Sequence, residues 1–464
     1  MHDIYRWIDE RRPELIAELQ ELLQQPSISA QQIGLEECAT LLMTQMHRDG
    51  IANTHIEPVE DAPAIVYATE RAADPAAKTL LCYGHYDVQP PEPLDKWIDP
   101  PFSAAIRDDV IYARGATDNK SGVLAFVRAA QAFKEVRGAP PVNLVFLFEG
   151  EEEMGSPHLE RWVLDHQELC QCDASIGLDG GVNRTSYKPE IHLGIKAILV
   201  VELRVRSHGI DFWSGRAQLM KAKSAPWRLV HCLASIFDAQ GRITVDGWYD
   251  DLLPPDEDDL RHLHEELQFF DRAELARQYG LSADFPFDDD LELLRAIHYG
   301  ASCNINGLYA GYTGAGSKTI VPTAAMVRLD FRCPPNLEPV DQVAKLRAHL
   351  ERNGFDDIEV VVHTARANPY KTPVREAISQ AVIASADEIW GEPPLVMGVS
   401  TQGTIMIHVP HPAVMSGFGA AENNLHAPNE NMPIERYIQG IKFAASIFQQ
   451  FADRASAPST HSHH

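Results

Sequence analysis

The sequence lacks any apolar run of about 18 residues, so no membrane-spanning helix is expected. The segment that starts at Met1 is polar and has no apolar stretch of the kind that signal peptides carry. Basic residues are outnumbered by acidic ones, and the formal net charge is −26. Because phosphates are bound through Lys and Arg, this charge argues against nucleic acid or an anionic membrane as a partner.

Closely spaced cysteines are also absent, apart from Cys170 and Cys172. The seven cysteines are scattered and odd in number, and nothing near this pair completes a zinc knot. We therefore expect reduced thiols in a cytoplasmic protein. Residues 455–464 are small, polar and rich in histidine, so their histidines are left out of any site.

The chain does have the length of two or three domains, with 464 residues. From about residue 62 to 190, apolar runs that are typical of strands alternate with loops and a helical segment. The expected strands are 66–68, 79–83, 142–148 and 174–178, and the expected helix is 121–136. This alternation predicts an α/β fold with a mostly parallel central sheet covered by helices. In such sheets, ligands bind where strands end in loops at the carboxyl edge.

The pattern changes near residue 191 and predicts a smaller α+β lobe. Its expected strands are 197–206, 326–332 and 358–363, and its expected helix is 338–353. Near 246–292 lies an insertion with the acidic runs 256–259 and 288–290, a composition typical of a solvated helical excursion.

Two further helical segments, 374–390 and 433–451, follow the smaller lobe. We therefore predict a main domain in two segments, 1–190 and 373–464, interrupted by a lid domain over 191–372.

Candidate metal ligands follow the expected strands of the main domain. His85 and Asp87 end the strand 79–83, and metal-bound imidazole needs its second nitrogen tied to an acceptor. His85 is thus a candidate ligand with Asp87 as its orienting partner; a surface histidine at a strand end is the alternative. Asp118, in a glycine-flanked turn, suits a carboxylate that bridges two cations, and a helix N-cap is its alternative role.

Four acids, Glu149 and Glu151–Glu153, follow the strand 142–148 directly. Like charges repel there unless a cation or a paired general base compensates them. Asp179 closes the next strand, and His426 lies in a turn too polar to be core. These nitrogen and oxygen ligands suit two zinc-like cations that share one carboxylate, which makes hydrolysis of an amide bond the leading interpretation.

Three motifs now carry a resemblance to a known family. Gly84-His85-Tyr86-Asp87-Val88-Gln89-Pro90, residues 114–122 and residues 149–156 resemble ligand motifs of the co-catalytic zinc metallopeptidases, a family that includes carnosine dipeptidases, succinyl-diaminopimelate desuccinylase, aminoacylase and glutamate carboxypeptidase. The nearest likeness is to the carnosine dipeptidase branch, and it covers nearly the whole chain. The resemblance implies that the main domain is catalytic and that the lid is ferredoxin-like and forms a homodimer.

The same resemblance assigns roles to the candidate ligands. It implies two Zn²⁺ ions, for which Mn²⁺ and Co²⁺ are alternatives. One ion would lie on His85, Asp118 and Asp179, and the other on Asp118, Glu153 and His426. Glu152, the first of the two adjacent glutamates, would be the base that activates a bridging water.

Substrate contacts are implied for residues of the lid and of a later loop. Thr319, in the glycine-rich segment 311–322, matches a threonine that contacts substrate, and Arg332 matches an arginine that grips a substrate carboxylate. A surface charge at a strand edge is the alternative role of Arg332. Thr404 stands in the loop 400–404, where the family usually has a serine, and keeps the hydroxyl.

One position departs from the family pattern. Where this branch carries Asp-Leu-His-Ser-Gly, the chain reads Asp211-Phe212-Trp213-Ser214-Gly215, so tryptophan replaces a histidine that polarises the scissile carbonyl. Either Trp213 donates its indole N–H, or His208 stands in, or the substrate is not an ordinary dipeptide and Trp213 stacks on it. We favour the third explanation.

Three functions therefore compete. The first is a dinuclear hydrolase that cleaves an amide bond in a small dipeptide-like or N-acyl amino acid substrate with a free carboxylate. The second is an amidohydrolase or deaminase that acts on a non-peptide substrate, which Trp213 favours and Arg332 and Thr319 disfavour. The third is a non-catalytic, metal-stabilised binding protein, against which Glu152 counts because a structural metal site needs no unliganded base.

Overall fold

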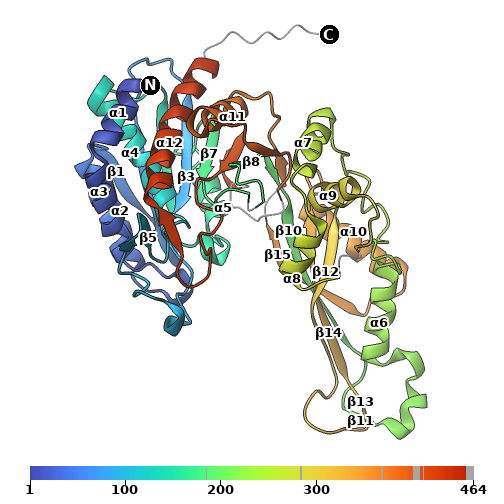
Figure 1. The fold of residues 1–464 in the computed structure, drawn as a ribbon. Coiled ribbons are helices and arrows are strands. Elements are labelled where there is room, and N and C mark those ends of the chain that lie inside the picture. Colours follow the sequence, from blue (N-terminus) through green and yellow to red (C-terminus); the bar gives the residue numbers. More distant parts are fainter. Residues whose placement is uncertain (184, 283–284, 367–368, 401–407, 411, 456–464) are drawn as a thin grey trace.

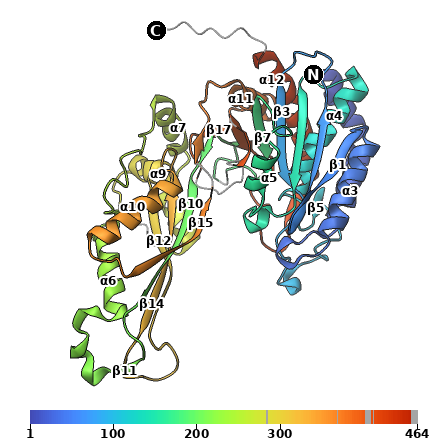
Figure 2. The ribbon, with the colours of Figure 1, turned by 180° about the vertical axis from the view of Figure 1, so that it is seen from behind.

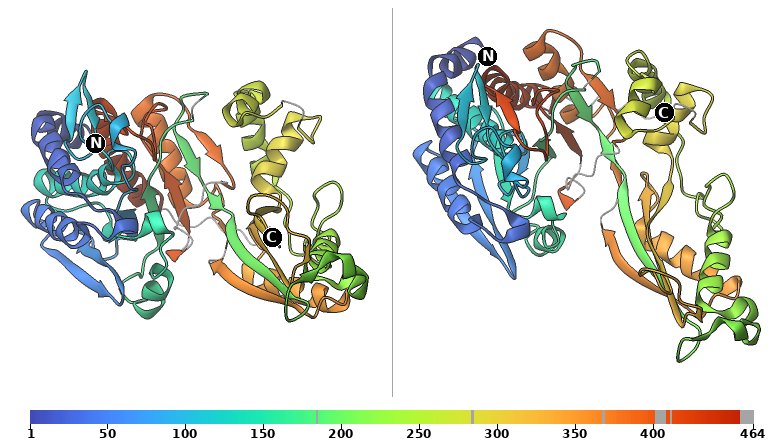
Figure 3. Two further views of the ribbon diagram at one scale, coloured as in Figure 1. Left: turned by 90° about the horizontal axis from the view of Figure 1, so that it is seen from below. Right: turned by 60° about the horizontal axis from the view of Figure 1, so that its bottom comes forward.

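The computed structural model describes residues 1–464 except 184, 283–284, 367–368, 401–407, 411 and 456–464. The chain folds into two bodies that lie side by side, the large lobe (residues 1–192 and 372–455) and the small lobe (residues 197–366) (Figure 1, Figure 2). Figure 3 shows the two lobes from two further directions. No helix in the described ranges is long and apolar enough to cross a membrane.

The large lobe is built on an eight-stranded sheet with the order β1-β2-β6-β3-β7-β18-β8-β17. The neighbours β6, β3, β7 and β18 run parallel, whereas β1–β2, β2–β6 and β18–β8 are antiparallel pairs. The predicted α/β fold with a mostly parallel sheet centre is thus confirmed. The strands are β1 (Asn53–Val59), β2 (Ala62–Glu70), β3 (Thr79–His85), β6 (Asn143–Glu149), β7 (Ala174–Leu178), β8 (Glu190–His192), β17 (Leu395–Met397) and β18 (Ala413–Ser416).

Alternate side chains of the central strands enter two separate cores. On one face, Leu80 and Cys82 of β3 pack in the cluster that α4 and α12 supply, and on the other face Leu81 and Tyr83 pack in the cluster of α5. Because both faces are covered, β3 and β6 have continuous apolar runs rather than alternating ones. The helices are α1 (His2–Glu10), α2 (Arg12–Gln24), α3 (Leu35–Arg48), α4 (Lys120–Arg137), α5 (Leu159–Asp165), α11 (Ala377–Trp390) and α12 (Ile434–Ala455).

The small lobe has its own core on a four-stranded antiparallel sheet with the order β12-β14-β10-β15. Along β10, buried and more exposed residues alternate, because helices cover only one face. The strands are β10 (Ala197–Arg206), β12 (Ser302–Ala310), β14 (Ala324–Cys333) and β15 (Ile358–Arg366); the helices are α6 (Ala225–Ile236) and α10 (Pro339–Arg352). At the far end of this lobe, β11 (Phe212–Trp213) pairs with β13 (Ile320–Val321) (Figure 1).

A short connecting ribbon joins the two lobes. In it, β9 (Gly194–Ile195) pairs with β16 (Tyr370–Lys371) in antiparallel register. Next to this ribbon, Lys196 is buried and donates hydrogen bonds to the carbonyl oxygens of Ile297 and Gly300. The predicted domain boundaries at 190/191 and 372/373 lie close to the ribbon and stay predictions.

The acidic insertion is helical, as expected, and forms α7 (Glu257–Leu267), α8 (Arg272–Tyr279) and α9 (Asp290–Tyr299). The expectation of a solvated segment is wrong for Asp259, which is buried. Asp256 and Asp259 form a capping box, each side chain accepting the other residue's backbone N–H. Lys371 of the connecting ribbon is ion-paired with both carboxylates, so α7 packs against the junction of the lobes.

Candidate metal centre

The candidate ligands come from three neighbouring parallel strands and two loops. His85 ends β3, Asp179 follows β7, and Glu152 and Glu153 lie in a single 3₁₀ turn after β6. Since β6, β3 and β7 are adjacent and parallel, their carboxyl ends meet at one edge of the sheet. The sequence-predicted ligands are therefore brought together there by sheet topology.

The loops that carry Asp118 and His426 are held together by a smaller sheet. In this sheet, β19 (Asn431–Pro433), which follows the His426 loop, pairs with β5 (Val110–Tyr112), which precedes the Asp118 loop. His426 has a φ of 58°, a left-handed conformation that is uncommon outside glycine and often found at functional positions. The third strand of this sheet is β4 (Ala105–Arg107).

His85, Asp118 and Asp179 form the first ligand group. Their nitrogen and carboxylate oxygen atoms lie within 4.8 Å of one another. The Nε2 atom of His85 is 3.0 Å from Oδ1 of Asp118 and 3.6 Å from Oδ2 of Asp179. This nitrogen is buried and makes no hydrogen bond within the described residues, which is what a metal-ligating atom requires. The alternative of a surface histidine is wrong, because His85 is fully buried.

Asp118, Glu153 and His426 form the second ligand group, again within 4.8 Å. The Nε2 atom of His426 is 2.9 Å from Oδ2 of Asp118 and 3.3 Å from Oε2 of Glu153. Asp118 therefore directs one carboxylate oxygen toward each histidine, the arrangement of a bridging carboxylate. The N-cap alternative for Asp118 is wrong: Asn119 is the N-cap of α4, and no side-chain capping bond forms there.

The carboxyl groups of the two ligand groups are buried close together, which changes their pKa values. Burial raises the pKa of Asp118, but the hydrogen bond with His426 and the neighbouring imidazole of His85 outweigh burial and leave the pKa below its usual value. Burial and the neighbouring Asp118 charge raise the pKa of Asp179, and burial is also the main cause that raises the pKa of Glu153. Cations at the two ligand groups would neutralise this repulsion, so the donor set fits two divalent metal ions.

Glu152 belongs to neither ligand group. Its Oε2 atom lies 3.9 Å from Nε2 of His85, so the carboxylate is beside the ligands. Burial, and then repulsion from Asp179, Asp118 and Glu153, raise the pKa of Glu152 well above its usual value against the opposing attraction of His85. A carboxyl group whose proton affinity is raised next to a metal site suits a general base.

Asp87 contacts both His85 and the turn that carries Glu152 and Glu153. Its Oδ1 atom lies 3.3 Å from Nδ1 of His85, and its two oxygens accept the backbone N–H groups of Glu152 and Glu153, both at 3.1 Å. Asp87 is fully buried. It therefore orients the imidazole of His85 and fixes the turn that carries the glutamates.

Glu430 was not singled out from the sequence, yet its buried carboxylate organises the Asp118 loop. It accepts hydrogen bonds from Nη1 of Arg114 at 2.7 Å and from the backbone N–H groups of Gly115 (3.1 Å), Thr117 (2.9 Å) and Asp118 (3.1 Å). A lone acid in an asparagine-rich turn gives no sequence signal for such a role. The only hint is its position four residues after His426.

The predicted substrate contacts that the structure describes are spread over the small lobe. Arg332 lies near the end of the central strand β14, not at a sheet edge, so that part of its alternative role is wrong. Trp213 is 63% exposed at the far tip, where its ring covers Gly215 so closely that a Cβ atom there would clash. Thr319 precedes β13 at the same tip and accepts the backbone N–H of Ser214 through its carbonyl oxygen. Thr404 lies outside the described residues.

His208 is held by local contacts. Its Nδ1 atom is 2.8 Å from the hydroxyl of Ser207, and its Nε2 atom is 3.3 Å from the carbonyl oxygen of Val321. Both ring nitrogens are thus engaged, which disfavours His208 as a stand-in for the family's lid histidine.

Two ligand groups that share a carboxylate, beside an unliganded glutamate, define a metal-dependent hydrolase. The chain belongs to peptidase family M20/M25/M40, whose model matches residues 81–450. It is therefore a hydrolase of a metallopeptidase family, and the suspected membership is confirmed.

Curated relatives match most of the chain. Beta-Ala-His dipeptidase of Mus musculus is 28% identical, over 85% of this chain and 81% of the relative. Cys-Gly metallodipeptidase DUG1 of Candida albicans is 25% identical, over 95% of each.

Solved structures of similar proteins also match nearly the whole chain. The M20 family metallo-carboxypeptidase Sso-CP2 from Sulfolobus solfataricus superposes with a TM-score of 0.84 at 33% identity, covering 95% of this chain and 99% of that one. Human carnosine dipeptidase 1 superposes with a TM-score of 0.71 at 25% identity, covering 97% of this chain and 98% of that one.

Proposed function

We propose that this protein cleaves the amide bond of a small dipeptide-like or N-acyl amino acid substrate with a free carboxylate, using two divalent cations and Glu152. One observation carries the proposal: Asp118 directs one oxygen to each of two histidines, and each pair is completed by a further carboxylate. The names of the similar proteins, which include dipeptidases for Beta-Ala-His and Cys-Gly, support a dipeptide as the substrate class.

The two cations would be held by His85, Asp118 and Asp179 on one side and by Asp118, Glu153 and His426 on the other. We expect Zn²⁺, while Mn²⁺ and Co²⁺ accept the same ligands. When bound, such a pair polarises the scissile carbonyl and makes a water molecule more acidic.

Glu152 takes the proton of the attacking water and delivers it to the leaving nitrogen. Its position outside both ligand groups leaves its carboxylate free for this transfer. Asp87 keeps Glu152 and His85 in place. Arg332 supplies a planar guanidinium for the substrate carboxylate, and Thr404 and Thr319 add hydroxyl contacts.

The small lobe acts in this proposal as a lid and as a dimerisation domain. Trp213 and Thr319 are at its tip, next to the end of β14 that begins at Ala324. Arg332 lies eight residues further along β14, which places its backbone about 26 Å from Ala324 at about 3.3 Å per residue. A dipeptide spans only about 7 Å, so one substrate reaches both groups only if they belong to different subunits. The edge strand β12 exposes the apolar side chains of Ile305, Leu308 and Tyr309, which are shared between its two faces, and such an edge suits pairing with a second copy.

The seven free thiols support a cytoplasmic location. The substrate is small, and with a net charge of −26 we expect neither nucleic acid nor a membrane as a partner.

A second candidate function is favoured by Trp213. An exposed indole at the tip suits stacking on a flat group, as a non-peptide amide offers for an amidohydrolase or deaminase. Hydrolysis of a panel of dipeptides and N-acyl amino acids, by wild type beside Trp213→His, separates the two. Strong wild-type dipeptide turnover favours the peptidase, whereas turnover that appears only with the histidine restored favours bulkier or aromatic amides.

The decisive variant is Glu152→Gln. It removes the base but no ligand, so we expect the metal content to be unchanged and the rate constant kcat to fall by about 10²–10⁴-fold. Metal analysis and steady-state kinetics measure the two effects. Glu160→Gln, an exposed glutamate on α5, is the matched control and should keep full activity.

Full activity of Glu152→Gln would assign the proton transfer to another residue. If the metal-loaded wild type hydrolyses none of the panel, the non-catalytic binding protein becomes the better description.

A further inference from the structure

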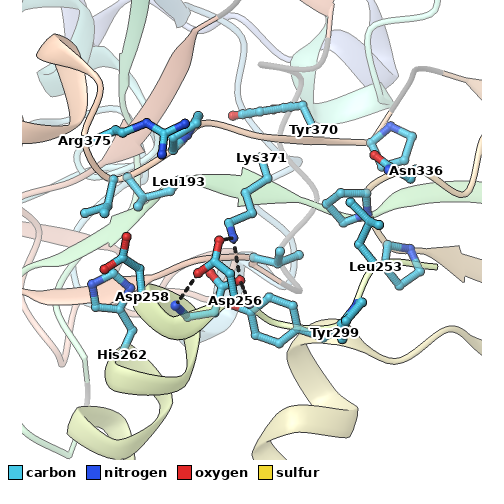
Figure 4. A pocket seen from close by; sticks show the side chains of 18 residues that line it. Leu193, Leu253, Asp256, Asp258, His262, Tyr299, Asn336, Tyr370, Lys371 and Arg375 are labelled. Atoms are coloured by element: carbon cyan, nitrogen blue, oxygen red, sulfur yellow. Dashed lines mark hydrogen bonds and ion pairs between the residues drawn. The ribbon is translucent and has the colours of Figure 1, made fainter. Parts of the chain in front are cut away.

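A pocket of about 420 Å³ lies at the junction of the lobes, away from the metal centre. Its walls come from the connecting ribbon (Tyr370, Lys371), from α7 and from the loop 334–336 of the small lobe (Figure 4). Leu193 and Val399, which also line it, follow β8 and β17; these strands run opposite to β18, toward the edge away from Asp179. None of the lining residues is a candidate metal ligand.

One wall of this interlobe pocket carries a partly compensated charge. Lys371 is ion-paired with Asp256 at 2.7 Å and with Asp259, and Asp259 is buried in the capping box. One ammonium charge offsets one of the two carboxylate charges, so this wall repels an anion less than two free acids would. The charged side chains without a buried ion pair lie elsewhere in the pocket.

Two groups at one end of the pocket lack partners. Arg375 is exposed and makes no ion pair or hydrogen bond with any residue that the structure describes. His262 is only 6% exposed, yet its buried Nδ1 atom has no hydrogen-bond partner among the described residues. A buried imidazole nitrogen without a partner costs free energy unless a ligand or water satisfies it.

Asp258 supplies the opposite charge at the same end. Figure 4 shows Arg375 across from Asp258 and His262, while Leu253, Tyr299 and Asn336 lie at the other end. Among the residues that the structure describes, Asp258 is ion-paired with Arg261 alone, at 2.7 Å, and both side chains are about half exposed. Such a surface pair contributes little, so Asp258 remains able to bind an ammonium group.

We propose that the interlobe pocket binds a free α-amino acid with an apolar side chain. Arg375 binds its carboxylate, Asp258 its ammonium group and His262 the remaining polar contact, while Leu253 and Pro334 face its side chain. In an α-amino acid both charges sit on one carbon, which matches charged groups gathered at one end. A dipeptide carries its charges at opposite ends and does not match.

The pocket is lined by residues of both lobes, so a bound ligand would contact both lobes and influence how they are placed relative to each other. If the proposed function holds, the ligand is of the same class as the products of the reaction. The occupancy of the pocket then rises with the concentration of product. This last step alone rests on the proposed function; binding itself does not.

Calorimetric titration of L-leucine into the full-length, metal-loaded protein tests the proposal, because leucine has no bond for the enzyme to cleave. We expect saturable binding that Arg375→Gln and Asp258→Asn each weaken by at least about tenfold, the effect of losing a charged hydrogen bond. 4-Methylpentanoate, which lacks the ammonium group, and isoamylamine, which lacks the carboxylate, should bind weaker by a similar factor.

Arg332→Gln is the control that separates this pocket from the metal centre. Leucine binding should survive it, and Arg375→Gln should leave dipeptide turnover without leucine unchanged. Absence of saturable leucine binding overturns the proposal. Binding that Arg332→Gln abolishes and Arg375→Gln leaves intact overturns it too, since the amino acid then occupies the metal centre.

Discussion

At the scale of single residues, the metal centre depends on a carboxylate that touches no candidate cation. Glu430 gathers three backbone N–H groups of the Asp118 loop and the buried guanidinium of Arg114. Each of these donors would be costly to leave unsatisfied in the interior. Glu430 thus fixes where the bridging oxygens of Asp118 point.

We predict that Glu430→Gln weakens metal binding while every ligand stays in the sequence. The amide NH₂ group of glutamine turns a donor toward N–H groups that need an acceptor, so the Asp118 loop shifts. Loss of a supporting contact of this kind typically costs about 10–100-fold in metal affinity. Competition with a chelator measures it.

The exposed Glu435, which pairs with Arg12 on the surface, provides the control. Glu435→Gln should leave metal affinity unchanged. Equal affinities for wild type and Glu430→Gln would mean that the loop keeps its shape without the carboxylate.

The contrast between Glu430 and His85 shows what the sequence can predict about the site. His85, Glu153 and Asp179 each follow an apolar run, and strand ends of a parallel sheet are where ligands gather. Glu430 has no such context, and its partner Arg114 is 316 residues away in the sequence. Contacts of that range depend on the folded topology, which local patterns do not encode.

At the scale of secondary-structure elements, the sheet of the small lobe is joined by a charge network. Glu202 of β10 is buried and contacts Arg328 on β14 at 2.7 Å, Arg204 at 2.5 Å and His363 on β15 at 3.3 Å. Hydrogen bonds with Arg328 and then Arg204 lower the pKa of Glu202 to about 2. One carboxylate therefore links three adjacent strands.

This network predicts an acid-sensitive contribution to stability. Because the folded-state pKa of Glu202 lies below that of an unfolded glutamate, the unfolded chain binds the extra proton first as the pH falls. The stabilisation is present above the usual glutamate pKa of about 4.3 and is lost as the pH falls toward 2. Denaturant unfolding of the protein at several pH values measures this dependence.

Glu202→Gln should lower the free energy of unfolding at neutral pH. It should also make that free energy fall less steeply as the pH is lowered from about 4.3 toward 2. Glu351→Gln, at an exposed position of α10 away from the network, should change neither. Parallel pH profiles for wild type and Glu202→Gln would show that the network contributes no linked stability.

The acidic insertion shows which features can be predicted from local sequence and which cannot. Its helices and caps could be predicted, because Asp at an N-cap is a local signal. That Asp259 is buried could not, because Lys371 lies 112 residues further on and meets it only when the lobes are joined. Composition alone therefore made a buried contact look like a solvated surface.

At the scale of the whole molecule, the groups expected to act on one substrate are far apart. Figure 1 shows β11 and β13 at the end of the small lobe that is remote from the large lobe. Arg332, in contrast, pairs with Ile198 next to the connecting ribbon. We therefore expect Arg332 to act in its own subunit and the tip, with Trp213 and Thr319, to act in the partner's site.

This arrangement predicts complementation between two defective proteins. Glu152→Gln has no base but an intact tip, and a Trp213→Ala/Thr319→Ala variant has an intact centre but a defective tip. After subunit exchange, a mixed dimer contains one complete site, so an equal mixture should regain about a quarter of wild-type activity in a two-fold dimer. Mixing Glu152→Gln with Arg332→Gln should restore nothing, because both defects then act within their own subunits. Native mass spectrometry verifies the exchange, and mixed dimers without recovered turnover would place the tip outside the reaction.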